Sequence, residues 1–296
     1  MRFLASLPRE RWMRLVAMGI VGGMAGANLI WSIQTWPMGD IRIYWDAGER
    51  IRSGEPLYPG VDPFHSYRYA PWFAWMWAAF SVLPYWLVAV IWQAALLVAT
   101  AAIAVPFLRH GWVGLALAGL MVPLLFAVSA GGNVQALVVV SLLYGIDRRS
   151  GPVWIAIAAS LRATPILFVL VYAARREWGR FWITVALTAV LVAPMLWYDP
   201  LTLLTDVAGR EPGLFAESPV LYAVVAIGSV AVAAGLAWRR SKYTIIAAAA
   251  AAVLASPKLF AYDVTTFMAV HPGRPPRSAE GEPPDPAPGG PARADR

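Results

Sequence analysis

Cysteine is absent from this chain of 296 residues. Disulfide bonds, thiolate catalysis and cysteine-ligated metal sites are therefore excluded. Charged residues are also scarce, at 14% of the chain, whereas 59% of the residues are hydrophobic. The surface of a water-soluble domain must be largely polar, so this composition predicts that lipid covers much of the molecule.

Several motifs that mark familiar chemistries are missing as well. The sequence contains no nucleotide-binding glycine loop, no zinc-ligand spacing, no serine–histidine–aspartate arrangement and no close aspartate pair of the kind that holds metal-bound sugar nucleotides. The net charge of +7 does not indicate a nucleic-acid partner, because the basic residues form short clusters between apolar runs instead of one stripe. We expect no metal and no cofactor.

Long apolar runs dominate what is present. A bilayer core about 30 Å thick requires about 20 apolar residues per helical crossing. The composition of these runs favours helices over the alternating strands of a barrel. We predict an all-α, polytopic membrane bundle with about eight embedded segments. The apolar runs that supply these segments are residues 12–32, 71–83, 85–107, 112–128, 133–146, 154–174, 181–197, 220–238 and 243–255, and not every run needs to be embedded.

Two of these segments are expected to be irregular. Residues 71–83 are rich in aromatic side chains and end before Pro84, which favours a helix near the lipid headgroups that does not cross. Residues 154–174 are interrupted before Pro165, and proline disfavours helical geometry in the residue before it. Two half-helices that meet at Arg162 would leave both flanks on one side.

Basic clusters predict the orientation. By the positive-inside rule the clusters lie in the cytoplasm, at Arg2 to Arg14, Arg148 and Arg149, Arg175 to Arg180, and Arg239 to Lys242. The N-terminus is then cytoplasmic, residues 12–32 are a retained helix and not a removed signal peptide, and residues 35–70 form the first outer loop. The expected location is the plasma membrane.

The C-terminal part differs in composition. Residues 271–296 are rich in Pro, Gly and charge and contain almost no large apolar residue, so they are predicted to be a disordered tail behind a membrane-embedded domain of residues 1–270. The apolar run 259–270 stops abruptly at this tail. A shortened gene product that lacks later helices is therefore an open alternative.

Asp40 is the candidate catalytic residue. It comes just beyond the first apolar run, where a carboxylate can take a proton from a hydroxyl group. Burial among Tyr44, Trp45 and apolar helices would raise its pKa. The spacing from Asp40 to Tyr44, Ala47 and Ile51 is helical, so an ordinary helix cap is the alternative role. The nearby acidic residues are interpreted as solvated helix charges, namely Asp46, Glu49 and Glu55.

Basic residues from distant parts of the chain are expected near Asp40. Arg68, Arg162 and Lys258 all fall in the outer half of the membrane in this topology, where such charges line a cavity or pair with an anion. A phosphate fits them, and the alternatives are snorkelling or anchoring at the interface. His65 is a weaker candidate for a phosphate contact.

Two polar stretches complete the candidate site. Residues 131–135 open a helix whose backbone donors, with Asn133 and Gln135, can bind an anion or sugar hydroxyls, or simply form an asparagine-capped turn. Tyr262 and Asp263 add a polar pair after Lys258.

The ordered set of motifs resembles a known family, over about residues 12–270. The first outer loop looks like that of GT-C glycosyltransferases, and the whole set is most similar to the bacterial polyprenyl-phosphate-mannose-dependent α-1,2-mannosyltransferases, once a domain of unknown function. The family usually has glutamine before the asparagine and lysine in place of Arg162, and it continues for several more helices. The matching stretches are Gly39-Asp40-x-x-x-Tyr44, Gly54-Glu55-Pro56-Leu57-Tyr58, Tyr67-Arg68-Tyr69-Ala70-Pro71, Gly132-Asn133-Val134-Gln135, Leu161-Arg162-Ala163-Thr164-Pro165 and Ser256-Pro257.

The resemblance implies a GT-C-like bundle that transfers a hexose, mannose in that family, from a polyprenyl-phosphate donor to a lipid-linked or glycan acceptor on the extracytoplasmic side. Asp40 would act as the base, while Arg162, Lys258, Arg68 and His65 would bind the donor phosphate without a metal. Sugar or lipid contacts would come from Tyr44, Trp45, Tyr69, Asn133 and Gln135.

Two other classes of function fit part of the pattern. Broken helices with intramembrane charges also mark transporters, including those for lipids or lipid-linked sugars. An inactive membrane scaffold is the third possibility.

Overall fold

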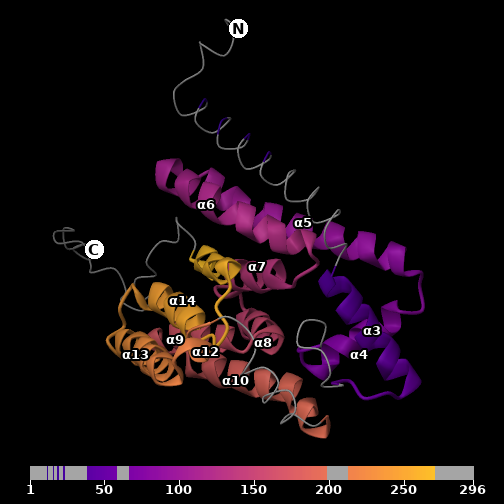
Figure 1. The fold of residues 1–296 in the computed structure, drawn as a ribbon. Helices are drawn as coiled ribbons and strands as arrows, with labels where there is room; N and C mark the ends of the chain where they lie inside the picture. The colour runs from indigo at the N-terminus through magenta and orange to yellow at the C-terminus, as the bar shows by residue number, and fades with distance from the viewer. Residues whose placement is uncertain are drawn as a thin grey trace, which may run out of the picture.

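The computed structural model describes residues 39–58, 67–198 and 213–270, together with the single positions Trp12, Val16, Gly19 and Gly23. Every regular element in these ranges is a helix (Figure 1). The all-α prediction is confirmed for this part of the chain. Most of the predicted first helix, His65 and the tail 271–296 lie outside the described residues.

Among the described residues, four helices are long and apolar enough to cross a membrane. They are α5 (Tyr85–Leu108), α6 (Gly111–Ala130), α10 (Trp178–Val192) with its 3-10 continuation η2 (Ala193–Trp197), and α13 (Pro219–Trp238). The bounds of each helix differ by at most a few residues from those of a predicted span. With their composition, these helices identify a membrane protein.

Shorter helices fill the space between the long ones (Figure 1). Their side chains form much of the core, in which Leu142, Ile155 and Phe168 are fully buried. The short helices are α7 (Gln135–Gly145), α8 (Gly151–Leu161), η1 (Thr164–Phe168), α9 (Val169–Ala174), α12 (Leu214–Glu217), α14 (Thr244–Leu254) and the 3-10 helix η3 (Ala261–Ala269).

The predicted break at Arg162 is confirmed, although its local cause differs from the expected one. Arg162 is extended, with φ −145° and ψ 125°, after α8 has ended at Leu161. Thr164, which precedes the proline, already belongs to η1, and Pro165 takes an early helical position where its missing N–H is not needed. The break therefore precedes the proline by several residues.

The two flanks of this broken segment meet. Arg175, after α9, pairs with Asp147, before α8, at 2.8 Å. Arg180, at the start of α10, donates to the carbonyl of Ile146 at 2.9 Å. Two of the predicted basic clusters thus lie together at one end of the bundle, as two half-helices that return to the same side require.

Helices α3 (Gly39–Ser53) and α4 (Pro71–Phe80) pack side by side at one edge of the bundle (Figure 1). A Cβ added to Gly48 would lie 2.6 Å from the backbone carbonyl of Trp77, so a glycine is needed where the two helices approach. The predicted helix that begins near Asp40 is confirmed. So is the short aromatic helix: ten residues of α4 span about 15 Å, half of a bilayer core.

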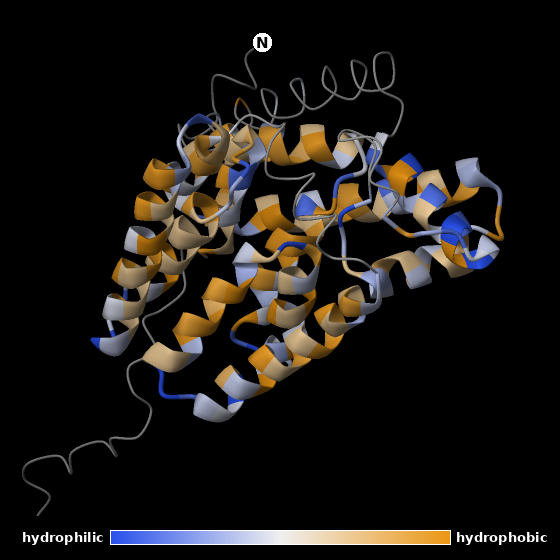
Figure 2. Cartoon of the chain, turned by 60° about the horizontal axis from the view of Figure 1, so that its bottom comes forward, coloured by the Kyte–Doolittle hydropathy of each residue, from blue (hydrophilic) through white to orange (hydrophobic). Residues whose placement is uncertain are grey.

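Hydrophobic and hydrophilic residues are distributed unevenly over the helices (Figure 2). Hydrophobic residues cover the long helices, while hydrophilic residues gather at helix ends and connections. Within the most apolar stretches of α10 and α13, only 6% and 11% of the residues are buried, against 39% and 44% in α5 and α6. Helices α10 and α13 therefore expose most of their side chains on the outside of the described bundle.

Candidate functional site

The start of α3 is fixed against the turn between α6 and α7. The backbone N–H of Asp40 donates to the carbonyl of Gly131 at 3.1 Å. Gly132 has φ +88°, and a Cβ there would lie 2.2 Å from Cγ1 of Ile41. A glycine is thus required both for the backbone conformation and for the close approach. This junction sets the position of Asp40.

Asn133 holds the Asp40 side chain. Its Nδ2 donates to Oδ2 of Asp40 at 2.7 Å, while its Oδ1 accepts from the backbone N–H of Gln135 at 3.0 Å. The sequence left open whether Asn133 caps a helix or contributes to a site. The oxygen of the amide accepts the first backbone N–H of α7, and its nitrogen contacts the carboxylate.

The electrostatic surroundings favour proton uptake by Asp40. Burial raises the pKa of this carboxyl above its ordinary value of 3.8, because a charged carboxylate is poorly solvated there. The hydrogen bond from Asn133 and the charges of Arg162 and Arg68 act in the opposite direction, and burial outweighs them. Asp40 is therefore a stronger base than a solvated aspartate, as the sequence predicted.

Arg162 lies at the same site and is held by residues of η3. One guanidinium nitrogen pairs with Oδ1 of Asp263, and the other donates to the hydroxyl of Tyr262 at 2.9 Å. Its Cζ lies 5.0 Å from the centre of the Tyr262 ring. Asp263 is only 3% exposed, whereas the Arg162 side chain retains 23% exposure. Part of the Arg162 side chain is thus exposed.

The predicted aromatic contacts divide into two groups. The Tyr69 hydroxyl accepts from the Tyr44 hydroxyl at 3.0 Å, and Tyr69 interacts electrostatically with both Asp40 and Arg162. Tyr44 itself is fully buried, and the Trp45 ring packs edge-on against Tyr85 with 5.5 Å between centroids. The side chains of Tyr44 and Trp45 are therefore packed in the core, and Tyr69 is the one of these three that interacts with both Asp40 and Arg162.

Gln135 joins two elements from a fully buried position. Its Nε2 donates to the hydroxyls of Thr265 and Thr266 on η3, at 3.1 and 3.3 Å. The hydroxyl of Thr265 in turn donates to the carbonyl of Tyr262 at 2.6 Å. This network ties the first turn of α7 to the segment that holds Arg162.

The remaining basic candidates are less closely defined. Arg68 precedes α4, is half-buried and attracts Asp40. Lys258 is half-buried in the connection from α14 to η3, where its carbonyl accepts from Ser256 Oγ at 2.6 Å. The contact of Lys258 with a phosphate stays a prediction.

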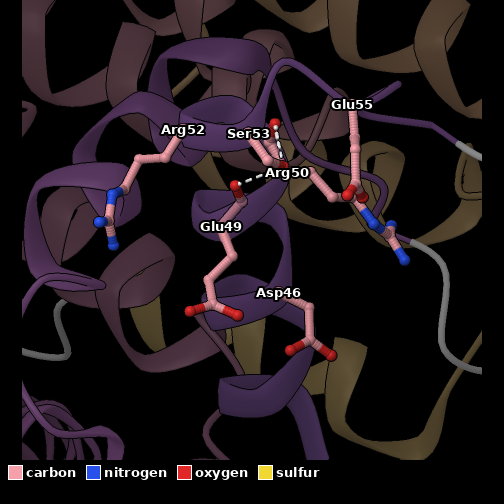
Figure 3. A pocket seen from close by; sticks show the side chains of 6 residues that line it. All are labelled: Asp46, Glu49, Arg50, Arg52, Ser53 and Glu55. Atoms are coloured by element: carbon pink, nitrogen blue, oxygen red, sulfur yellow. Dashed lines mark hydrogen bonds between the residues drawn. The ribbon is translucent and has the colours of Figure 1, made fainter.

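A separate charged hollow lies at the other end of α3 from Asp40 (Figure 3). Its volume is about 570 Å³. Glu49 and Glu55 are exposed, and half-buried Asp46 pairs with Arg42 at 2.9 Å, so the structure agrees with their interpretation as solvated helix charges. The residues that line the hollow are Asp46, Glu49, Arg50, Arg52, Ser53 and Glu55.

The structure also gives roles to residues whose contacts the sequence did not reveal. Tyr262 and Asp263 stood out as a polar pair, but their partner Arg162 is about 100 residues away in the chain. Thr265 and Thr266 gave only a weak signal, as two hydroxyl residues inside an apolar run. Comparison with protein families, with curated proteins and with solved structures found no match to this chain.

Proposed function

We propose that this protein is an inverting membrane glycosyltransferase. It transfers a hexose, mannose by resemblance, from a polyprenyl-phosphate donor to a hydroxyl of a lipid-linked or glycan acceptor, on the extracytoplasmic side of the plasma membrane. The observation that carries this proposal is a single half-buried carboxylate, Asp40, held by Asn133 and placed within the electrostatic reach of Arg162 and Arg68.

The proposed reaction is a single displacement. Asp40 removes the proton from the acceptor hydroxyl, and that oxygen forms a bond to the anomeric carbon of the donor sugar. The bond between the anomeric carbon and the phosphate oxygen breaks, and its electron pair stays on that oxygen. The polyprenyl phosphate is the leaving group. Attack opposite to the leaving group inverts the configuration, and the proton remains on Asp40 until it passes to solvent.

The departing phosphate requires positive charge near it. Arg162 has five N–H donors, and its hydrogen bonds to Asp263 and Tyr262 use only some of them. The remaining donors can form charge-assisted hydrogen bonds to phosphate oxygens. Arg68 and Lys258 add charge in this proposal, and His65 would protonate or bind a phosphate oxygen.

Substitution of Asp40 tests the proposal. Purified protein in lipid should transfer sugar from a polyprenyl-phosphate hexose to a glycolipid acceptor, and Asp40→Asn should lower the rate by about 100-fold or more. Asp46→Asn, on the solvated side of the same helix, should leave the rate unchanged. Equal rates for Asp40→Asn and the unsubstituted protein would remove Asp40 from its assigned role.

A lipid or lipid-linked sugar transporter is the second candidate. The observation in its favour is the discontinuous segment α8–η1–α9 with the charged Arg162 at its break, because discontinuous helices form substrate sites in transporters. In sealed vesicles, movement of the intact lipid-linked sugar between leaflets without cleavage of the sugar–phosphate bond would favour this function. Release of lipid phosphate in step with acceptor glycosylation would favour the transferase.

A further inference from the structure

We infer that Asp263 is a positioning residue: it holds Arg162 against Tyr262 and thereby prevents Arg162 from closing an ion pair with Asp40. The carboxylate of Asp40, held by Asn133, then remains able to accept a hydroxyl proton. That catalytic consequence rests on the proposed function, whereas the arrangement of the three charges does not.

Arg162 interacts with both carboxylates. It pairs directly with Asp263 and attracts Asp40 from a greater distance. Asp40 instead receives its short hydrogen bond from the neutral amide of Asn133, at 2.7 Å. The guanidinium of Arg162 is thus bonded to residues of η3, although the Asp40 carboxylate also attracts it.

Asp263 is built to stay in place. Its Oδ2 accepts from the backbone N–H of Phe260 at 2.9 Å, which caps the start of η3, and its Oδ1 accepts from Arg162. The Phe260 ring lies parallel to the Tyr262 ring at 5.2 Å, so the surface under the guanidinium is also fixed. Asp263 is only 3% exposed and each of its two carboxylate oxygens accepts a hydrogen bond, so it does not easily release the arginine.

Of the two cations that lower the pKa of Asp40, Arg162 has the larger effect and Arg68 the smaller. Among the described residues, the titratable groups that act on Asp40 or are acted on by it are Tyr44 on α3, Arg68 and Tyr69 before α4, Arg162 after α8 and Tyr262 on η3. Three of these are tyrosines, whose phenols are neutral near pH 7. Loss of the Asp263 charge leaves Asp40 as the carboxylate that attracts Arg162, and a direct ion pair lowers the pKa of a carboxyl.

The test is a double-mutant cycle read out on the Asp40 carboxyl itself. Infrared difference titration of purified protein in lipid, with each variant compared with its own Asp40→Asn partner, isolates the protonation of Asp40 without donor or acceptor. Asp263→Asn should move the midpoint down by about one pH unit, because Arg162 closes on Asp40. Arg162→Gln should move it up.

The combined variant Arg162→Gln/Asp263→Asn decides between positioning and general support. If Asp263 acts through Arg162, its removal has no further effect on the Asp40 midpoint in the Arg162→Gln background. If Asp263 has only a structural role, Asp263→Asn shifts the Asp40 midpoint equally in the unsubstituted and the Arg162→Gln protein. That result would overturn the inference. Asp263→Glu should keep a midpoint near that of the unsubstituted protein, and Asp46→Asn should have no effect.

A milder substitution covers the case in which loss of a buried partner prevents folding. Tyr262→Phe removes one acceptor of Arg162 and keeps the ring. It should lower the Asp40 midpoint by a smaller amount, and an unchanged midpoint would contradict the inference. Because the titration needs no substrate, a shifted midpoint in a protein without transferase activity would refute the proposed function and leave the positioning role intact.

Discussion

Asp40 experiences two opposing effects whose balance determines its chemistry. Burial destabilises its charged form, while Asn133, Arg162 and Arg68 stabilise that form. Because burial is the larger effect, the carboxyl titrates above 3.8. This preference has separate consequences for rate and for stability.

The rate of sugar transfer should depend on pH through Asp40. The base acts in its charged form, so activity is lost as the pH falls through the raised pKa of the folded protein. The acid limb of the rate profile should therefore lie above the pH range of a solvated aspartate. A profile measured at saturating donor checks this, and a limb at or below pH 3.8 would contradict it.

Asp40→Asn should increase stability at neutral pH. Since the pKa of Asp40 is raised on folding, the folded state binds the proton more tightly than the unfolded state, and stability falls as the pH rises through this range. A neutral asparagine removes that cost and can still accept from Asn133. Thermal unfolding should show a higher midpoint, by about 2–4 °C for each kcal/mol recovered.

The low-pH measurement provides the control. Below 3.8 the carboxyl is protonated in both states, so the difference between Asp40→Asn and the unsubstituted protein should shrink. A variant that is less stable at neutral pH would indicate that the Asp40 carboxylate contributes net stability, contrary to the effect of burial.

At the level of elements, the junction of α3 with the turn between α6 and α7 depends on Gly132. Gly132→Ala should destabilise the fold by about 1–3 kcal/mol, because it combines a positive φ with a Cβ 2.2 Å from Ile41. It should also reduce transfer, since the same junction positions Asp40. Thermal unfolding and rate measurements check both effects.

Gly119→Ala is the matched control for this substitution. Gly119 lies inside α6, and no atom lies within 4 Å of a Cβ built there. Alanine also has a higher helix propensity than glycine. The control should therefore be neutral or slightly stabilising, and equal losses in the two variants would show that the turn is not specifically sensitive.

The sequence predicted helices better than it predicted their partners. Long apolar runs gave the bounds of α5, α6 and α13 within a few residues, because length and hydropathy are local properties. The placement of Asp40 at the start of a helix was equally readable. The pairing of Arg162 with Asp263 was not, because it depends on how η3 folds back against α7 and α14.

The same distinction applies to Tyr44 and Trp45. Aromatic residues beside a candidate acid are compatible with a sugar-stacking surface or with a core, and only the packing of α3 on α4 and α5 separates these possibilities. The structure places both side chains in the core. Side-chain direction on a short amphipathic helix could not be derived from a single turn of sequence.

For the whole molecule, the absence of cysteine makes a direct test of topology possible. Single substitutions Ser53→Cys and Ser150→Cys introduce exposed thiols, at the end of α3 and beside Arg149 respectively. In intact cells, a membrane-impermeant maleimide should label the thiol at position 53 and not the one at position 150. Permeabilised cells should show labelling of both, which controls for reactivity.

The reverse pattern would place Asp40 on the cytoplasmic side and refute the proposed outer site. Labelling of both positions in intact cells would show that the number of crossings between them differs from the expected one. Either result could be obtained without a substrate.

Unequal burial of the long helices has a final consequence for how the protein responds to its bilayer. When the hydrocarbon thickness of a membrane does not match the apolar length of a helix, the helix tilts or the lipid deforms around it. Of the four long helices, α10 and α13 have the smallest share of buried residues, whereas α5 and α6 are more extensively packed against neighbours. Tilting in response to hydrophobic mismatch is therefore expected first in α10 and α13. The geometry around Asp40 should change little with lipid chain length.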